Sequence, residues 1–174
     1  MSRIQELTPE NMTPEQTEAW KALRSSGGIL GGPNIAYLRI PRLIPINQAL
    51  VGYLRSNSLP PRLRQLVVLR TVKYWGAKFA WGVHVPLSLK EGVEQDIIDA
   101  IERGEEAVSA SPRDRAALRV CTELLEKRGV SDEAYRAAID EFGEGGLADI
   151  VVTMGFYSMT SFTLNTFEID PPGR

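Results

Sequence analysis

The sequence repeatedly marks the start of a helix with a hydroxyl side chain followed by proline. Thr13 precedes Pro14, and Gln16 follows three residues after the threonine, which is the pattern of a capping box. Ser111 and Pro112 give a second strong N-cap signal. Strand patterns with alternating apolar residues are weak by comparison. The sequence therefore predicts an all-α fold.

Apolar residues at helical spacing place the helices between these signals and the glycines that follow them. We expect helices over about 13–24, 41–57, 61–75, 79–90, 94–103, 111–128 and 131–142, and a central buried helix over 147–167. Pro86 predicts a kink or an early end of its helix. The glycine-rich run 25–33 is predicted to be a flexible loop that could act as a lid. Since no low-complexity linker divides the chain, we expect one domain over 1–174, with irregular tails at 1–12 and 170–174.

Composition excludes several classes of protein. The 20 basic and 22 acidic side chains give a net charge of −2, which argues against a nucleic-acid partner. No apolar run approaches the roughly 20 residues that span a bilayer. The first residues lack the apolar segment of a secretory signal. We therefore expect a cytoplasmic protein with neither a membrane nor a nucleic acid as partner.

A single cysteine and a single histidine restrict the chemistry further. One Cys cannot form an intramolecular disulfide, a cysteine zinc site or a two-thiol redox pair. The glycine-rich run lacks the Lys-Ser or Lys-Thr end of a phosphate-binding loop, and the sequence contains no G-x-S-x-G turn that would present a serine nucleophile. Cys121 lies among leucines and is expected to be a small buried hydrophobe. The sequence thus predicts neither a metal nor a cofactor.

His84 is the only side chain whose ordinary pKa lies near neutrality. It lies on an apolar, tryptophan-rich helix, where it is either a hydrogen-bonded core histidine or a proton-transfer group. Tyr157, Ser161 and Asn165 follow one another at four-residue spacing on the last helix. They either line a pocket or bind helix carbonyls.

Basic residues on one helix form a second candidate cluster. Arg70, Lys73 and Tyr74 share a broad face by three- and four-residue spacing. Cations within an apolar helical hairpin need an acidic partner or an anionic ligand. Arg70 therefore either binds an anion or pairs with an acidic residue such as Glu168 or Asp149.

Residues 59–70, 75–84 and 91–93 together resemble the carboxymuconolactone decarboxylase family, which also contains alkylhydroperoxidase D-like proteins. The resemblance extends over most of the chain from about residue 13. It implies an all-α, alkylhydroperoxidase D-like helical bundle that assembles as a ring, as a homo-oligomer of three or six subunits. It says little about the substrate.

The resemblance also assigns positions, and this sequence departs from several of them. Trp81 and His84 are retained, but Gln65 and Ala80 stand where the family pattern has acidic residues. The Cys-x-x-Cys pair of the peroxidase branch falls at Ala77 and Ala80, so both thiols are absent. Thiol peroxidase activity, which needs a nucleophilic and a resolving thiol, is therefore disfavoured.

The function that the resemblance implies is decarboxylation, or a related lyase or isomerase step, on a small carboxylated lactone or oxoacid. His84 would donate or accept the proton, and Gln65 would orient His84 or bind a carbonyl. Arg70 or Lys73 would hold the carboxylate or the developing enolate. A repurposed member that only binds a small ligand is the alternative. The predicted substrate-binding residues are Arg70, Lys73, Tyr74 and Trp81.

Overall fold

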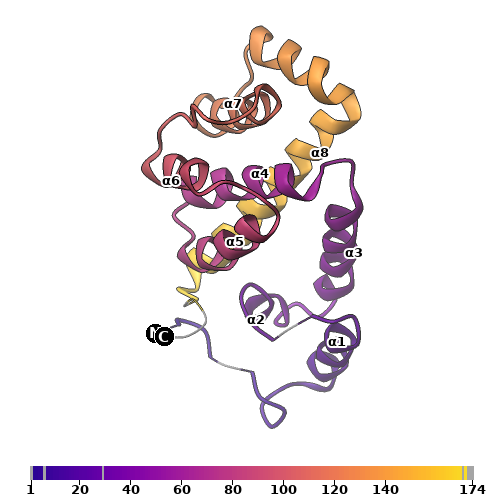
Figure 1. Ribbon diagram of the computed structural model, residues 1–174. Helices are drawn as coiled ribbons and strands as arrows, with labels where there is room; N and C mark the ends of the chain where they lie inside the picture. The colour runs from indigo at the N-terminus through magenta and orange to yellow at the C-terminus, as the bar shows by residue number, and fades with distance from the viewer. Residues whose placement is uncertain (1, 6, 29, 170, 172–174) are drawn as a thin grey trace.

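The computed structural model describes residues 2–5, 7–28, 30–169 and 171, and these form helices with no strand (Figure 1). The all-α prediction is confirmed. The helices are α1 (Pro14–Ser25), α2 (Asn34–Tyr37), α3 (Leu43–Ser56), α4 (Pro61–Tyr74), α5 (Lys78–Lys90), α6 (Gln95–Arg103), α7 (Pro112–Lys127) and α8 (Asp132–Thr166).

The helix starts follow the caps that the sequence contains. The Thr13 hydroxyl accepts the Gln16 N–H, and the Gln16 side chain accepts the Thr13 N–H in return. Ser111 caps α7 in the same way with Asp114. Gly76, at φ 63°, separates α4 from α5 in the left-handed conformation that glycine adopts without steric cost.

Helix α5 ends at Lys90, as the predicted range 79–90 has it, and Pro86 lies inside it, so the alternative of an early end at this proline is wrong. The next residues remain tied to the helix, since Ser88 Oγ donates to the His84 carbonyl at 2.7 Å. The helices predicted over 131–142 and 147–167 are both present as the two parts of α8, which is kinked between them at Gly143 (φ 66°, ψ 179°).

The glycine-rich segment after α1 is a loop, but part of it is packed. Gly32 is buried, and a Cβ atom at this position would lie 2.9 Å from Cε1 of Phe79 on α5. A larger residue at Gly32 would displace this ring. The loop is therefore anchored near its end rather than free along its length.

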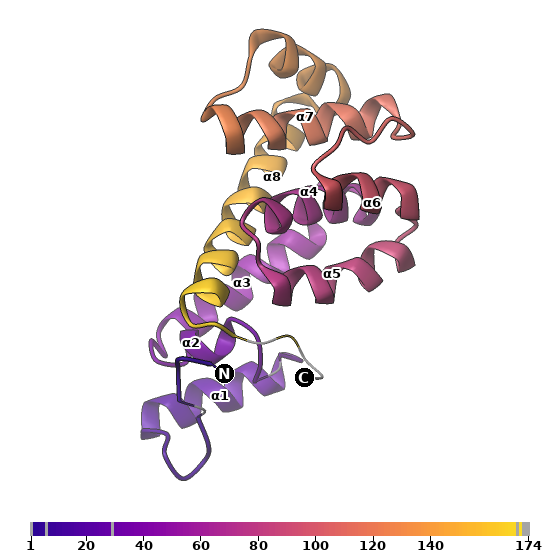
Figure 2. The ribbon, with the colours of Figure 1, turned by 90° about the vertical axis from the view of Figure 1, so that its left-hand side faces the viewer.

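Helix α4 lies at the centre of the bundle and packs against α5, α6, α7 and α8 (Figure 2). Seven of its side chains are buried, which accounts for its weak apolar periodicity. The main core joins α4 and α8 with α6 and α7 through residues such as Leu66, Val67, Ile97, Val120 and Ile150. The helix that carries Gln65 and Arg70 is therefore held from several sides.

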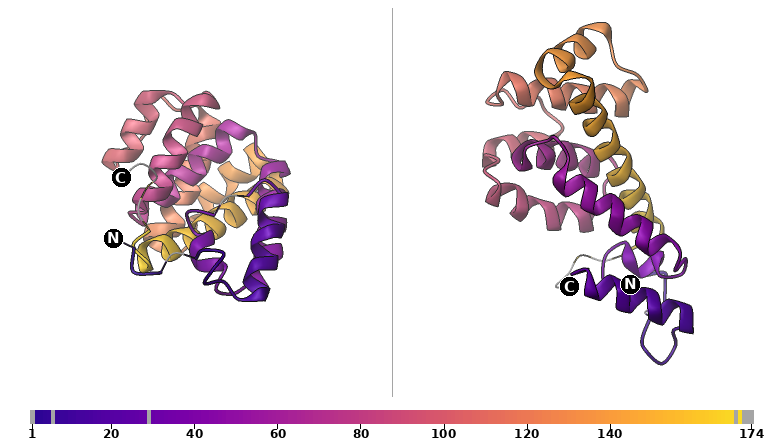
Figure 3. Two further views of the ribbon diagram at one scale, coloured as in Figure 1. Left: turned by 90° about the horizontal axis from the view of Figure 1, so that it is seen from below. Right: turned by 90° about the vertical axis from the view of Figure 1, so that its right-hand side faces the viewer.

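Helices α1, α2 and α3 gather beside the C-terminal end of α8 (Figure 3). Hydrogen bonds connect this part of the chain to α8 and to Phe167, and in one of them Thr163 Oγ1 of α8 donates to the Tyr37 hydroxyl of α2 at 3.4 Å. The Tyr53 hydroxyl donates to the buried carboxylate of Asp149, which also accepts the Ser58 hydroxyl at 2.6 Å, and the Arg3 N–H donates to the Phe167 carbonyl. A separate core holds these helices together, formed by Leu7, Leu23, Tyr37, Leu38 and Ile44.

Helix α8 is long and apolar enough to cross a membrane by length and composition alone. However, 44% of its most apolar window is buried inside the protein, and the break at Gly143 falls within its length. These are the features of a core helix. Its outer face nevertheless leaves several apolar side chains exposed, among them Val151, Val152, Met159 and Phe162.

Candidate proton-transfer site

His84 and Gln65 meet where α5 packs on α4. The distance from His84 Nδ1 to Gln65 Oε1 is 2.9 Å. An amide oxygen only accepts hydrogen bonds, so Nδ1 must carry the imidazole proton in this contact. The lone pair of the neutral ring is therefore on Nε2. This atom forms no hydrogen bond with any residue in the described part of the chain.

Tyr157 of α8 packs against the same imidazole. The two ring centroids are 4.9 Å apart and the ring planes are perpendicular, which is a favourable edge-to-face geometry. Burial raises the pKa of the Tyr157 phenol to about 12, so the group keeps its proton at neutral pH. Gln65 and Tyr157 thus fix the imidazole from α4 and α8.

The protonation state of His84 follows from its surroundings. Burial lowers its pKa to about 4, because the charged imidazolium loses its hydration. Gln65 is neutral and cannot restore that charge, as a carboxylate at the same position would. The imidazole is consequently neutral at pH 7. In the free protein His84 is a proton acceptor, and the predicted donor role requires it to be protonated first.

The positions that would carry redox thiols are filled by alanines within the core. Ala77 and Ala80 are 1% and 3% exposed and pack with Val68 and Val72. Cys121 is fully buried in the main core, and burial raises the pKa of its thiol to about 12. A thiol of this kind is inert at neutral pH.

Three predicted substrate-binding residues lie near the junction of α4 and α5. Lys73 Nζ lies 5.6 Å from the centre of the Trp81 ring, which is a cation–π contact. Trp81 also packs against two core clusters. Tyr74 is 39% exposed and makes an edge contact with Trp75 at 4.9 Å between centroids. Lys73 and Trp81 therefore contact each other, while Tyr74 lies at the surface.

Arg70 points to α7 rather than to α5. Its Nε donates to Thr122 Oγ1 at 3.0 Å, and its guanidinium forms an ion pair with Glu126. The structure thus gives Arg70 an acidic partner, but that partner is neither Glu168 nor Asp149. The structure does not bring Arg70 together with the Gln65 contact.

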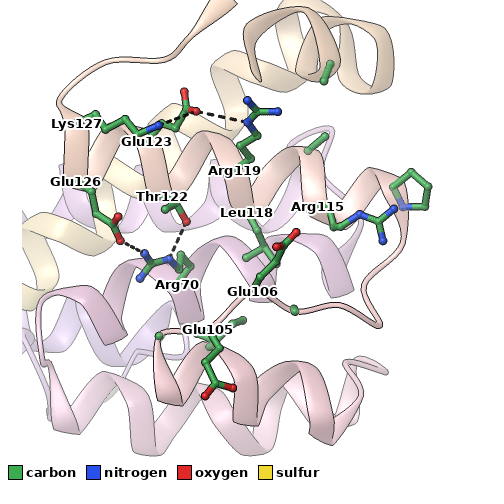
Figure 4. Close-up of a pocket in the computed structure, with 16 residues that line it drawn as sticks. Arg70, Glu105, Glu106, Arg115, Leu118, Arg119, Thr122, Glu123, Glu126 and Lys127 are labelled. Carbon is green, nitrogen blue, oxygen red and sulfur yellow. Dashed lines mark hydrogen bonds and ion pairs between the residues drawn. The ribbon is translucent and has the colours of Figure 1, made fainter. Parts of the chain in front are cut away.

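A cavity of about 640 Å³ lies on the Arg70 side of α4, lined by residues of α4, α6 and α7 and by the segment that joins α6 to α7 (Figure 4). Several of its charged side chains pair with one another. Figure 4 shows Arg70 bound to Thr122 and Glu126, and Glu123 bound to its neighbours Arg119 and Lys127. The cavity contains no imidazole and no thiol. It is therefore not the proton-transfer site.

Of the two interpretations that the sequence leaves open for Tyr157, the structure places this residue against His84. Arg64, which precedes Gln65, is not among the predicted site residues. Arg64 Nη1 donates to the Leu54 carbonyl at 2.8 Å, and the Arg64 charge lowers the pKa of the Tyr157 phenol against the effect of burial. In the sequence, the position of Arg64 next to Gln65 could have pointed to it as a site residue. However, α4 carries several arginines, and the sequence does not distinguish among them.

The other polar residues of the last helix bind backbone. Ser161 Oγ donates to the Tyr157 carbonyl at 2.7 Å, and Asn165 Nδ2 donates to the Trp75 carbonyl at 2.6 Å. Only Tyr157 of this series contacts His84. Among the described residues, no three His, Cys, Asp or Glu side chains gather as metal ligands.

The sequence profile of the Carboxymuconolactone decarboxylase family matches residues 43–123, which include Gln65 and His84. No curated protein matches the chain.

Solved structures share the fold at low sequence identity. A protein of unknown function from Agrobacterium tumefaciens, provisionally named as the antioxidant defence protein AhpD, superposes with a TM-score of 0.70 at 22% identity, over 77% of this chain and 93% of that one. An uncharacterized peroxidase-related protein with an alkylhydroperoxidase AhpD core, from Ralstonia eutropha, gives 0.79 at 15%, over 99% and 93%. The debrominase Bmp8, in a cysteine-to-alanine variant with 2,3,4-tribromopyrrole, gives 0.77 at 11%, over 99% and 93%.

Proposed function

Because the profile of the carboxymuconolactone decarboxylase family matches residues 43–123, we propose that the protein is an enzyme that moves a proton on a small carboxylated lactone or oxoacid. The reaction is a decarboxylation or a related lyase or isomerase step, and it uses no cofactor. His84 is the proton-transfer group, and Gln65 orients it. The observation that supports this most strongly is the Nδ1 contact with Gln65, which leaves Nε2 open.

The neutral imidazole suits proton abstraction directly. Nε2 would take a proton from the carbon next to the carbonyl group, and the electron pair of the broken C–H bond would move onto the carbonyl oxygen as an enolate. Where a carbon–carbon double bond of the substrate is conjugated with this enolate, the imidazolium would return the proton to the far carbon of that double bond, which shifts the double bond. This sequence is an isomerisation and consumes no other reactant.

Decarboxylation places a different demand on His84. The bond between the ring carbon and the carboxylate breaks, carbon dioxide leaves, and the electron pair forms an enolate that must take up a proton. An imidazole whose pKa is about 4 does not hold that proton in the free protein. The substrate's own carboxylate, bound beside the ring, would raise this pKa and so allow His84 to bind a proton.

A small-ligand binder without catalysis is the second candidate, and the low pKa of His84 favours it. Neither Gln65 nor Ala80 supplies the carboxylate that would activate the imidazole. The debrominase Bmp8, which shares the fold, is described in complex with the small ring 2,3,4-tribromopyrrole. A thiol peroxidase is opposed by Ala77 and Ala80 and by the buried, protonated Cys121.

We also retain the proposal that the chain forms a homo-oligomer. Its support is the outer face of α8, where Val151, Val152, Met159 and Phe162 are between 37% and 49% exposed. Apolar side chains gathered on one face of a helix are typical of subunit contacts. The mass of the protein in solution, measured by light scattering during gel filtration, tests this directly. A monomeric mass would contradict it.

An ultraviolet assay of carboxymuconolactone turnover tests the enzymatic proposal. We compare the wild type with His84→Gln, which keeps a polar side chain but cannot take up a proton. Turnover should fall by about 100-fold or more, as for loss of a general acid or base. Thermal melts of both proteins show whether the fold is intact.

Equal turnover in the two proteins would refute the role of His84. If the wild type converts no substrate, yet the lactone quenches the fluorescence of Trp75 or Trp81, the protein is the ligand binder instead.

A further inference from the structure

Tyr157, whose ring packs against the neutral imidazole, carries a hydroxyl that no described residue binds. Its Oη forms no hydrogen bond with a described residue, and it is not among the polar atoms sealed from solvent. His84 Nε2 has the same two properties. The perpendicular contact at 4.9 Å keeps the two rings together. His84 Nε2 can only accept a hydrogen bond, whereas the neutral Tyr157 hydroxyl can donate one.

Positively charged residues act on the Tyr157 hydroxyl, whereas the Gln65 side chain that binds His84 is neutral. Arg64 is held at one end, where Nη1 donates to the Leu54 carbonyl at 2.8 Å and more weakly to the Leu59 carbonyl at 3.4 Å. Its Nε and Nη2 groups donate to no described residue. The positive charges of Arg64 and Arg55 both act on the Tyr157 phenol. The Gln65 contact on the other side of the imidazole is uncharged.

We propose that the substrate's carboxylate binds on the Tyr157 side of the site, where the Tyr157 hydroxyl donates a hydrogen bond to it and Arg64 supplies the positive charge. His84 Nε2 then faces the remainder of the substrate. This assignment rests on the proposed proton-transfer function and deepens it. It replaces Arg70, which is occupied by Glu126, with Arg64 as the arginine that recognises the anion.

The test uses furan-2-carboxylate, a flat five-membered oxygen ring with one carboxylate, as a probe of binding alone. Because the chain has one histidine, its imidazole C–H signals in an NMR spectrum belong to His84 without assignment. We expect the probe to shift these signals in a saturable way. The uncharged furan-2-carboxamide should bind about tenfold more weakly, since it lacks the charge that Arg64 recognises.

Tyr157→Phe removes the hydroxyl and keeps the ring contact with His84. Its affinity for furan-2-carboxylate should fall about tenfold or more, which is the usual effect of losing a hydrogen bond to a charged group. Tyr135→Phe is the matched control on the same helix, because Tyr135 is 49% exposed. It should bind as the wild type does.

Arg64→Gln should lose the preference for the carboxylate over the amide, whereas Arg55→Gln, at an exposed position, should keep most of it. If Arg64→Gln does not fold, the affinities of Tyr157→Phe for furan-2-carboxylate and furan-2-carboxamide still show whether the carboxylate binds at Tyr157. The inference is overturned if the wild type does not bind furan-2-carboxylate, or if Tyr157→Phe binds it within about twofold of the wild type.

The experiments distinguish a failure of this inference from a failure of the proposed function. A protein that binds the probe through Tyr157 but never converts the lactone would keep the inference and refute the enzyme. If the wild type converts the lactone while Tyr157→Phe binds furan-2-carboxylate as the wild type does, the proposed function is kept and the inference about Tyr157 is refuted.

Discussion

The two sides of α4 use polar residues in opposite ways. On one side Gln65 holds His84, and Nε2 of His84 and the Tyr157 hydroxyl have no partner in the described structure. On the other side Arg70 is bound by Thr122 and Glu126, beside a cavity of about 640 Å³ in which Glu123 is bound by Arg119 and Lys127. The ion pairs on the Arg70 side join α4 to α7, whereas His84 Nε2 and the Tyr157 hydroxyl keep hydrogen-bonding capacity that no described residue uses.

The comparison shows that charge and cavity size are poor guides to the site in this fold. Paired ions lining a groove have already used their hydrogen bonds, and such pairs at a surface contribute little energy. A partly buried titratable group with a displaced pKa and an open lone pair is the stronger indication of function. His84 fits this description; beside Arg70, the pKa of the buried Glu123 is also lowered, to about 2, but its oxygens are bound by Ser131, Arg119 and Lys127.

The first prediction concerns acid stability, where the buried His84 should dominate. The unfolded imidazole binds a proton near pH 6.5, but the folded one does so only near pH 4. The folding stability from His84 is therefore present above pH 6.5 and lost as pH falls to about 4. This amounts to about 3 kcal/mol of unfolding free energy.

Urea unfolding at a series of pH values measures this loss. His84→Gln, which does not titrate, should show a shallower decline over the same range. If the two declines coincide, the imidazole titrates normally in the folded protein, and the contrast between the two sides of α4 loses its main support.

The second prediction is that Gln65→Glu raises the pKa of His84. A carboxylate at 2.9 Å from Nδ1 favours the imidazolium, and the pKa should rise by about 1–3 pH units. The single histidine signal, followed by NMR against pH, gives the value directly. Gln95→Glu, on an exposed turn of α6, is the matched control and should leave the signal unchanged. No rise in Gln65→Glu would mean that Gln65 does not contact the ring in solution.

The third prediction concerns the other side of the helix and is the smallest. Arg70→Gln should lower the unfolding free energy by about 1–2 kcal/mol, because it breaks the bonds to Thr122 and Glu126. Glu126→Gln should cost less, at most about 1 kcal/mol, since that carboxylate is half exposed. Denaturant unfolding gives both values.

Neither substitution should move the His84 NMR signal or the affinity for furan-2-carboxylate. A changed signal in Arg70→Gln would show that the two sides of α4 are coupled and would return Arg70 to the site.

Local signals in the sequence predicted most of the helices. The caps at Thr13 and Ser111 set the starts of α1 and α7, because their partners lie three residues away. The early end at Pro86 was the wrong alternative, because α5 continues to Lys90, whereas the two helices predicted on either side of residue 143 are present and are separated by a kink. The glycines Gly145 and Gly146 suggested a loop between the two helices. In the structure, the non-helical φ and ψ of Gly143 change the direction of the chain within α8, and no loop is formed.

The site was predicted in part. His84 was found because it is the only histidine, and Gln65 because of its place in a family pattern. The sequence left open whether Tyr157, Ser161 or Asn165 lines a pocket, because only the packing of α8 on α5 decides that Tyr157 is the one that contacts His84. Arg64 was not among the predicted residues, because α4 carries several arginines and the sequence does not distinguish them.

The sequence by itself determined the helical class, the inventory of reactive groups and the absence of a thiol pair at Ala77 and Ala80, since these depend on residue identity and local spacing. The tertiary structure decided the protonation state of His84, the partner of Arg70 and the role of Tyr157. Those properties arise from desolvation and from contacts between α4, α5, α7 and α8, which residues far apart in the chain create only when they pack together.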